Sequence, residues 1–280
     1  MTYRELYLQG KKSLALAEID SPGFDAAALA ERFLGLDRPG LAVRGEETPA
    51  PQAAEEYLRA VEQRAEHRPL QYILGSWPFM GLQLNVGEGV LVPREDTAVL
   101  VETLASRLEN PAPRGLDLCA GTGAVALGIC SLIPGAAVTC VEVDPLAGRF
   151  LRENLDRYPQ FRIEMIQGDI LSPPAADIPG GLDFIAANPP YIPTDQLPGL
   201  QAEVCREPVL ALDGGADGLD FYRAIAENWT PLLRPEGLLA VEIGETQARE
   251  AAEIFAAQGL WNIRVVQDLA GLDRVMIAEK

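Results

Sequence analysis

From Glu95 onward the chain alternates short apolar runs with segments of helical periodicity, and this pattern constrains the fold more than any other feature. Apolar strands separated by helices predict the α/β class, with a doubly wound, largely parallel sheet covered on both faces. The segment 268–272 between the last two runs is too short for a parallel crossover, so the last strand should be antiparallel. The expected strands are 115–119, 137–143, 162–166, 182–187, 237–243, 263–267 and 274–278, and the expected helices are 96–108, 125–132, 145–158, 218–233 and 246–258.

The first 75 residues have a different character. Apolar residues recur at helical spacing in three segments, and Asp25 is the expected N-cap of the second. Residues 77–92 alternate and carry glycines, which indicates a β-hairpin. We therefore expect a small all-helical N-terminal domain at 1–75, a hairpin linker at 76–93 and a seven-stranded α/β domain at 94–280. The expected N-terminal helices are 3–17, 26–36 and 53–67.

The run Asn188-Pro189-Pro190-Tyr191 closes the apolar strand 182–187. Two prolines cannot donate ladder hydrogen bonds, so the strand must end there in a stiff, extended turn. In an open α/β sheet, ligands bind at the carboxyl ends of the strands. A turn that presents an amide, a proline carbonyl and an aromatic ring can accept both N–H bonds of a planar –NH2 group and stack on its face. The alternative is an ordinary proline-rich loop.

A glycine-containing loop, Cys119-Ala120-Gly121-Thr122-Gly123, follows the first strand of this sheet. Glycines let the backbone turn tightly and approach a ligand. Glu142 closes the next strand about 20 residues later, where a carboxylate typically accepts hydrogen bonds from ribose hydroxyls. Asp144 competes for that role, although with Pro145 at N1 it also suits an N-cap. Asp169-Ile170 follows the third strand, where Asp169 either reaches an adenine amino group or serves only in a turn.

Two classes of enzyme fit the glycine loop. Gly121-x-Gly123-x-x-Ala126 also matches the dinucleotide fingerprint, so an NAD-dependent oxidoreductase is the rival hypothesis. A hydride-transfer enzyme has no need of Asn-Pro-Pro-Tyr. A methyl donor bound by the first two strands would place its sulfonium beside the fourth strand. There Asn188 and Pro189 could hold an amide or amino nitrogen for attack.

Composition removes several functional classes. The chain has one histidine, so His-based triads and multi-histidine metal sites are almost excluded. Its four cysteines show neither a C-x-x-C pair nor zinc spacing, and no metal is expected. The net charge of −18 is concentrated after Gly75, where 14 basic and 29 acidic residues lie. An acidic catalytic region repels phosphate backbones, so direct binding of nucleic acid is not expected.

No apolar run approaches the roughly 20 residues that span a bilayer, so no membrane partner is expected. The N-terminal residues lack the basic-then-apolar order of a signal peptide. We therefore expect the protein in the cytoplasm, or in an organelle matrix if a transit peptide has been removed.

The glycine loop, the acid after the second strand and Asn-Pro-Pro-Tyr after the fourth together resemble the class I S-adenosylmethionine-dependent methyltransferases that act on planar nitrogen. The whole chain more closely resembles the peptide chain release factor glutamine N5-methyltransferases. Asn-Pro-Pro-Tyr alone is shared with DNA adenine and ribosomal RNA methyltransferases, whereas the flanking segments are far more specific. These segments are 69–75, 79–82, 90–94, 207–212, 215–219, 242–244 and 268–275.

Two departures from the family pattern stand out. Where the family usually reads Pro-Arg-Pro-(Asp/Glu)-Thr-Glu, this chain has Pro93-Arg94-Glu95-Asp96-Thr97-Ala98. Arg94 and Thr97 are kept as supporting residues, whereas Ala98 cannot supply the final carboxylate of the family pattern. Ala120 replaces a common threonine, a change of little expected cost because backbone groups do most of the binding there. A related glutamine methyltransferase of a ribosomal protein tends to follow Pro-Arg with Ser-Pro, so Asp96-Thr97 favours the release factor enzyme.

The resemblance implies methyl transfer from S-adenosylmethionine to the glutamine of the Gly-Gly-Gln motif in a release factor, leaving S-adenosylhomocysteine. It implies that Asn188 and Pro189 accept the amide N–H bonds, that Pro190 stiffens the turn and that Tyr191 packs on the glutamine plane. It assigns the cofactor to the loop residues, Glu142, Asp169, Ile170 and Asn188. The helical domain would help to clamp the release factor, or else only pack. A methyltransferase-like fold kept as a protein-binding module is the non-enzymatic alternative.

Overall fold

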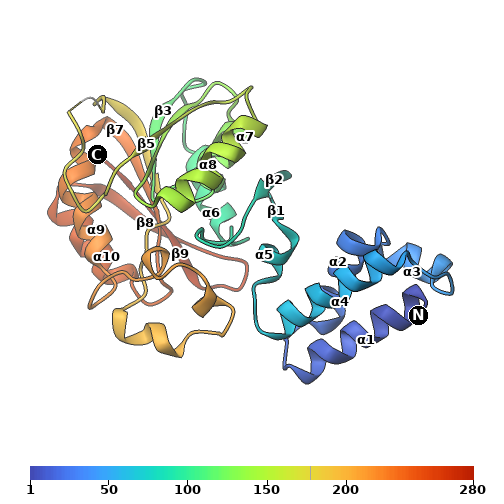
Figure 1. The fold of residues 1–280 in the computed structure, drawn as a ribbon. Helices are drawn as coiled ribbons and strands as arrows, with labels where there is room; N and C mark the ends of the chain where they lie inside the picture. The colour runs from blue at the N-terminus through green and yellow to red at the C-terminus, as the bar shows by residue number, and fades with distance from the viewer. Residues whose placement is uncertain (177) are drawn as a thin grey trace. The chain divides into compact units, whose positions relative to one another are not determined.

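The computed structural model describes residues 1–176 and 178–280, which form two compact units. The first unit contains Met1–Ser76 and Gln201–Arg206, and the second contains Trp77–Leu200 and Glu207–Lys280. In Figure 1 the first unit is mostly blue, and the second runs from green to red. A short segment from late in the chain therefore belongs to the N-terminal unit.

The first unit is helical, as the apolar spacing predicts. Its core is built from fully buried side chains of three long helices, among them Leu6, Leu29 and Tyr57. Two short helices, α3 and α5, are not expected from the sequence; both are too short to show a periodic pattern. The helices are α1 (Tyr3–Leu16), α2 (Pro22–Leu34), α3 (Arg38–Arg44), α4 (Pro51–Ala65) and α5 (Leu70–Leu74).

The predicted capping role of Asp25 is wrong. Helix α2 begins at Pro22, with Ser21 as its N-cap, because proline is well tolerated in a first helical turn. Asp25 is instead buried, and its Oδ2 accepts a hydrogen bond of 2.6 Å from Arg64 Nε. Arg64 also binds Glu203 Oε1 at 2.9 Å, so this buried guanidinium joins α2 to the segment Gln201–Arg206.

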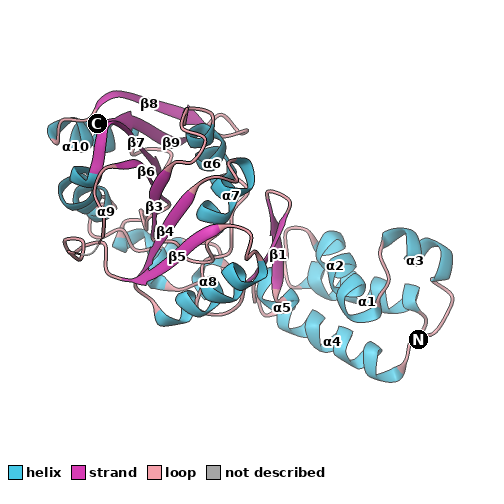
Figure 2. Cartoon of the chain, turned by 90° about the horizontal axis from the view of Figure 1, so that it is seen from above, coloured by secondary structure: helices cyan, strands magenta, loops and turns pink. Residues whose placement is uncertain are grey.

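The second unit is built on a seven-stranded sheet with the order β5-β4-β3-β6-β7-β9-β8, which Figure 2 shows. The last strand, β9, is antiparallel to both of its neighbours, and the other adjacent strands are parallel. The predicted α/β fold class is therefore confirmed, including the antiparallel last strand. The strands are β3 (Arg114–Leu118), β4 (Ala137–Glu142), β5 (Arg162–Gln167), β6 (Leu182–Ala187), β7 (Leu233–Glu242), β8 (Trp261–Gln267) and β9 (Asp273–Glu279).

Helices cover both faces of this sheet, because alternate residues of the central strands face opposite ways. On β6, Phe184 and Ala186 belong to one core cluster, and Ile185 and Ala187 belong to the other. The first cluster is completed by α6 (Thr97–Ala105), α7 (Ala124–Leu132) and α8 (Pro145–Arg157). The second is completed by α9 (Asp220–Ala224) and α10 (Ala248–Ala257), on the other side of the sheet in Figure 2.

Three connections differ in detail from the expected pattern. The hairpin consists of β1 (Ser76–Phe79) and β2 (Leu82–Asn85) with a turn at Met80-Gly81, so it is shorter than the alternation to residue 92 suggests. The helix expected at 218–233 changes after α9 into a π turn, Ile225–Trp229, and a 3-10 turn, Thr230–Leu232. Further 3-10 turns, at Thr194–Gly199, Val204–Arg206 and Val209–Ala211, follow the proline tetrapeptide. In the parts of the chain that the structure describes, no helix is both long and apolar enough to cross a membrane.

The strand order places a crevice at a defined edge of the sheet. The chain goes outward from β3 through β4 to β5 and then returns to the other side of β3 with β6. Connections on the two sides of this point leave in opposite directions, which opens a space at the carboxyl ends of β3 and β6. The glycine loop and the proline tetrapeptide follow these two strands directly.

Candidate active site

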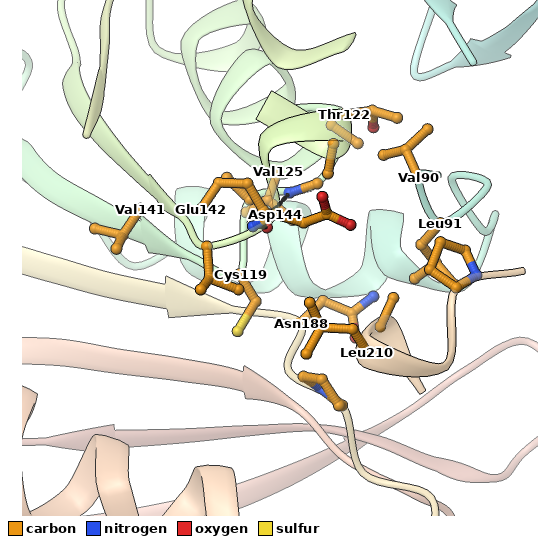
Figure 3. A pocket seen from close by; sticks show the side chains of 18 of the residues that line it. Val90, Leu91, Cys119, Thr122, Val125, Val141, Glu142, Asp144, Asn188 and Leu210 are labelled. Carbon is orange, nitrogen blue, oxygen red and sulfur yellow. Dashed lines mark hydrogen bonds between the residues drawn. The ribbon is translucent and has the colours of Figure 1, made fainter. Parts of the chain in front are cut away.

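A pocket lies at the carboxyl ends of β3, β4, β5 and β6, and all of its lining residues belong to the second unit. It encloses about 1070 Å³, including its mouth to solvent. Figure 3 shows Glu142 and Asp144 across this cavity from Asn188. The lining residues are 89–94, 97, 119–122, 124–125, 141–144, 147, 168–171, 188, 190, 208, 210–211 and 221.

The loop after β3 takes a backbone path that favours glycine. Cys119, Gly121 and Gly123 have φ angles of 59°, 54° and 81°. A Cβ on Gly123 would lie 2.6 Å from Leu151 Cδ1, so the start of α7 can approach α8 only with glycine there. Cys119 to Thr122 line the pocket, and Gly123 lies just behind them as the N-cap of α7.

Glu142 is fixed at the end of β4 by backbone donors. Its side chain is buried, Oε2 accepts from Gly121 N at 2.7 Å, and Oε1 accepts from Asp144 N at 2.9 Å. Burial raises the pKa of Glu142, and these N–H donors act in the opposite direction. Each carboxylate oxygen can accept a further hydrogen bond, so two neighbouring hydroxyls could be held. Asp144 caps α8 through Leu146 N at 2.8 Å, as Pro145 suggests.

Asp169 and Ile170 form the part of the wall that follows β5. Asp169 is exposed, and its Oδ1 accepts from Leu171 N at 2.9 Å, which is the turn role. Asp169 also lines the pocket, so its turn role does not remove it from a ligand's reach. Ile170 is buried, and its carbonyl oxygen accepts from Trp229 Nε1 at 2.8 Å.

Asn188 reaches the pocket from the end of β6. Its Nδ2 donates to Thr97 Oγ1 at 3.2 Å, and Thr97 Oγ1 donates to Glu242 Oε2 at 2.7 Å. Thr97 and Glu242 are both buried. Burial raises the pKa of Glu242, and the Thr97 hydroxyl and the charge of Arg274 act in the opposite direction. In the sequence, Glu242 stands out only as part of the family segment 242–244, and its place at the end of a buried strand beside β6 is the signal that marks it.

Tyr191 and Pro189 are not among the residues that line the pocket. The Tyr191 hydroxyl donates to Glu242 Oε1 at 3.3 Å, and its carbonyl oxygen accepts from Gln247 Nε2 at 2.9 Å. Tyr191 instead lines a second cavity, together with Gln247 and Arg274. The tetrapeptide therefore directs Asn188 and Pro190 into the pocket and ties Tyr191 to the buried glutamate.

Arg94 lies in the wall that precedes α6, and a buried carboxylate holds that wall. Glu207 accepts from Val92 N at 2.9 Å and from the guanidinium of Arg94. Glu207 is only 5% exposed, so both of its partners are well fixed. The sequence does not single out Glu207 as a wall residue, because its partners lie more than 100 positions away.

The Cys119 thiol of the pocket is poorly suited to act as a nucleophile. Burial raises the pKa of the Cys119 thiol, which therefore stays protonated near neutral pH. Over residues 1–176 and 178–280 there is no group of three or more His, Cys, Asp or Glu side chains placed to hold a metal ion. The arrangement suits binding and orientation: hydrogen-bond acceptors on two walls, joined by apolar surface.

Known proteins resemble this chain over its whole length. Residues 5–75 match the family model of the PrmC N-terminal domain, and residues 95–204 match the model of the methyltransferase small domain. A release factor glutamine methyltransferase of Moorella thermoacetica is 40% identical over 282 residues, which cover 99% of this chain and 98% of the relative. The protein of the same name from Geobacter sulfurreducens is 38% identical, over 94% of this chain and 91% of its own.

A solved structure shares the fold. A methyltransferase from Pyrococcus furiosus has a TM-score of 0.53 and 17% identity, over 71% of this chain and 89% of its own. A release factor-specific protein-(glutamine-N5) methyltransferase from Alicyclobacillus acidocaldarius is 30% identical over 70% of this chain and 98% of its own, with a TM-score of 0.41.

Proposed function

This chain belongs to the family of release factor glutamine methyltransferases, and from that premise we propose that it methylates the side-chain amide nitrogen, N5, of the glutamine in the Gly-Gly-Gln motif of a peptide chain release factor. The methyl donor is S-adenosylmethionine, and S-adenosylhomocysteine is the product. One observation carries the proposal. A single pocket is lined by the glycine loop and Glu142 on one side and by Asn188 on the other.

We call the wall with the glycine loop and Glu142 the donor side, because it would hold the methyl donor, and the wall with Asn188 the acceptor side, because it would hold the methyl acceptor. The residues on the donor side fit S-adenosylmethionine. Both oxygens of Glu142 are held by backbone N–H groups, and a carboxylate oxygen can accept more than one hydrogen bond, which suits the two ribose hydroxyls. Gly121 lets the backbone of Cys119 to Thr122 approach the bound molecule, and in our proposal Asp169 and Ile170, which also line the pocket, contact its adenine. When bound, the cofactor supplies an electrophilic methyl group on sulfur.

The residues on the acceptor side orient a poor nucleophile. The lone pair of an amide nitrogen is delocalised into its carbonyl group, so a strong base would help little before transfer. In our proposal Asn188 Oδ1 accepts one N–H bond of the glutamine amide, and the carbonyl oxygen of Pro189, which stands between the two lining residues Asn188 and Pro190, accepts the other. Holding the nitrogen in line at about 3–3.5 Å from the methyl carbon recovers several kcal/mol of the barrier.

The bonds and charges of the transfer balance simply. A nitrogen–methyl bond forms as the sulfur–methyl bond breaks, the positive charge passes from sulfur to nitrogen, and the proton then leaves the nitrogen for solvent. The two acceptors bind the N–H groups more strongly as positive charge develops, so they stabilise the transition state more than the bound substrate. This scheme needs no histidine, in agreement with a pocket that has none.

The other candidate functions have less support. Both relatives described above are named for release factors, which favours these substrates over a ribosomal protein. The first relative matches 99% of this chain and is named a methyltransferase, which favours methyl transfer over the hydride transfer of an NAD-dependent oxidoreductase. The glycine loop, Glu142 and Asn188 are all present in one pocket, which argues against the hypothesis that the fold is kept only as a protein-binding module.

We assign the remaining parts of the chain by the same reasoning. The helical domain at 1–75 recognises the release factor, the segment 76–93 is the linker, and the domain at 94–280 carries out the transfer. The acidic surface supports a protein partner with no direct contact to nucleic acid. Release factors act in translation termination, so we place the enzyme in the cytoplasm.

The test is methylation by the purified full chain with labelled S-adenosylmethionine. The substrates are an intact release factor, its Gly-Gly-Gln variant with Gln→Ala, and the candidate ribosomal protein. Label on the intact factor alone is the expected result. Label that persists on the Gln→Ala variant, or that appears only on the ribosomal protein, would overturn the proposed substrate.

A further inference from the structure

Thr97 and Glu242 are joined to Asn188 by a buried chain of hydrogen bonds. We call it the amide anchor; it runs from Asn188 Nδ2 to Thr97 Oγ1 at 3.2 Å and from Thr97 Oγ1 to Glu242 Oε2 at 2.7 Å. Thr97 is 3% exposed and Glu242 is 2% exposed. Burying a polar side chain costs free energy unless it is hydrogen-bonded, so polar residues at two such deeply buried positions call for an explanation.

Strand register brings the members of the amide anchor together. Ala187 on β6 pairs with Val241 on β7, so Asn188 and Glu242 follow side by side on parallel strands. Ala186 and Ala240 belong to the same core cluster, and strict alternation sends residues 188 and 242 to that same face. Helix α6 covers this face, and Thr97 is its first residue.

The chemistry of the anchor fixes which end of the Asn188 amide enters the pocket. Thr97 Oγ1 donates its single hydroxyl proton to Glu242 Oε2. The Thr97 oxygen can then act toward Asn188 only as an acceptor, and of the two polar ends of an amide only the NH2 end donates. The Nδ2 end of the Asn188 amide is therefore held by Thr97, and Oδ1 is the end that Thr97 does not bind.

A second donor holds the carboxylate of Glu242. The Tyr191 hydroxyl donates to Oε1 at 3.3 Å, so both oxygens of Glu242 have a hydroxyl partner. Tyr191 and Asn188 belong to the same tetrapeptide. Glu242 is therefore linked to that turn at two residues, directly at Tyr191 and through Thr97 at Asn188. If the Asn188 amide turned over, its oxygen would face the Thr97 oxygen, and two acceptors would oppose each other.

We propose that Thr97 and Glu242 are positioning residues that keep the oxygen of Asn188, and not its NH2 group, directed at the substrate amide. The inference rests on the proposed function, because an acceptor is needed there only if the substrate presents N–H groups. An inverted Asn188 would set its NH2 group against the NH2 group of the glutamine. Loss of the anchor therefore impairs the transfer step more than the binding of either substrate.

The kinetic test uses the full chain with a release factor and S-adenosylmethionine. Thr97→Val keeps the shape and removes the hydroxyl, and kcat should fall roughly 10- to 100-fold, which is less than the roughly 10²- to 10³-fold loss when a group that contacts the transition state is removed, because Asn188 is still present. KM for either substrate should change less than about threefold. Thr97→Ser, which restores the hydroxyl, should recover most of kcat.

The chain offers a matched control in Thr230, which is 1% exposed and donates to the Ala226 carbonyl oxygen at 2.7 Å. Thr230→Val makes the same chemical change outside the pocket, so it should lower thermal stability without a matching loss of kcat. A second pair is Glu242→Gln and Asp183→Asn, because Asp183 is a buried carboxylate of β6 that binds Arg114 N at 2.8 Å, outside the pocket. Only Glu242→Gln should reduce kcat.

The orientation can be measured without any substrate. In the 15N-labelled full chain, the side-chain NH2 resonances of Asn188 are identified by their loss in Asn188→Ala. They should shift and exchange faster with water in Thr97→Val, and should stay as in the wild type in Thr97→Ser and Thr230→Val. Unchanged Asn188 resonances in Thr97→Val would overturn the amide anchor.

The kinetic and spectroscopic results separate two failures. If the resonances move while kcat in Thr97→Val stays within about twofold of the wild type, the positioning role is wrong. If the wild-type chain methylates no release factor, the proposed function is wrong, and the Asn188 resonances still decide whether the amide anchor exists.

Discussion

The two sides of the pocket are each organised around a buried glutamate, but by different kinds of bond. On the donor side, Glu142 accepts hydrogen bonds from the backbone N–H groups of Gly121 and Asp144. On the acceptor side, Glu242 accepts them from the side-chain hydroxyls of Thr97 and Tyr191. Backbone donors exist at every position except proline, whereas hydroxyl donors depend on the residue type. Where backbone groups supply the hydrogen bonds, the donor side should therefore tolerate changes of side chain that the acceptor side does not.

The largest expected effect is that of Asn188→Ala, which removes the only acceptor side chain that we assign to the substrate amide. We expect kcat to fall about 10³-fold or more, because an oriented acceptor is lost in the transition state. Affinity for S-adenosylhomocysteine, measured by calorimetry, should stay within a few-fold. The matched control is Asn110→Ala, which removes an amide that binds Asp183 at 3.2 Å, outside the pocket. Wild-type methylation by the Asn188 variant would refute the assigned role.

Glu142→Gln should have the second largest effect, and mainly on binding. The new NH2 group would face one of the two backbone N–H donors, and the charge that favours ribose hydroxyls would be lost. We expect the Kd of S-adenosylhomocysteine to rise about 100-fold, the cost of losing roughly two hydrogen bonds to a charged group. At saturating cofactor, kcat should change only a few-fold. An unchanged Kd by calorimetry would count against the ribose assignment.

The same contrast decides how much of the site the sequence could predict. The donor side is local: Gly121 and Gly123 follow one strand, and Glu142 ends the next, so spacing along the chain is enough to locate it. The acceptor side is assembled by register. Asn188 is readable from its prolines, but Glu242 lies beside it only because β6 pairs with β7, and Thr97 lies there only because α6 packs over both.

The fold was predictable to a similar depth. Periodicity identifies the long helices and the buried strands, and a short connection gives the antiparallel direction of β9. It does not identify α3, α5 or the 3-10 turns, because segments of three to seven residues show too few repeats of any pattern. The hydrogen-bond partner of Asp25 could not be predicted from the sequence either, because Arg64 lies 39 positions away.

Gly123→Ala adds a side chain that the backbone of the donor side should not accommodate. Its effect should be smaller than those of Asn188→Ala and Glu142→Gln. The φ angle of 81° disfavours alanine, and a Cβ would meet Leu151 at 2.6 Å. We expect a loss of about 1–3 kcal/mol in the free energy of unfolding, measured by chemical denaturation, and weaker cofactor binding. Gly35→Ala is the control, because Gly35 has a φ of 65° but no atom within 4 Å of a built Cβ. Equal losses in the two variants would show that strain alone, and not the approach of α7 to α8, requires Gly123.

The smallest effect is expected for Ala120→Ser, the direct test of tolerance on the donor side. Ala120 lines the pocket, yet its hydrogen bonds come from its backbone: its N–H donates to Val141 O at 3.1 Å, and its carbonyl oxygen accepts from Gly123 N at 2.7 Å. A serine keeps both bonds and adds one oxygen, so the Kd of S-adenosylhomocysteine and kcat should each stay within about twofold, or less than 0.5 kcal/mol. Thr97→Val, an equally small change on the acceptor side, should reduce kcat at least tenfold. If Ala120→Ser is as damaging as Thr97→Val, side-chain identity matters equally on both sides, and the distinction between backbone and side-chain donors does not govern this pocket.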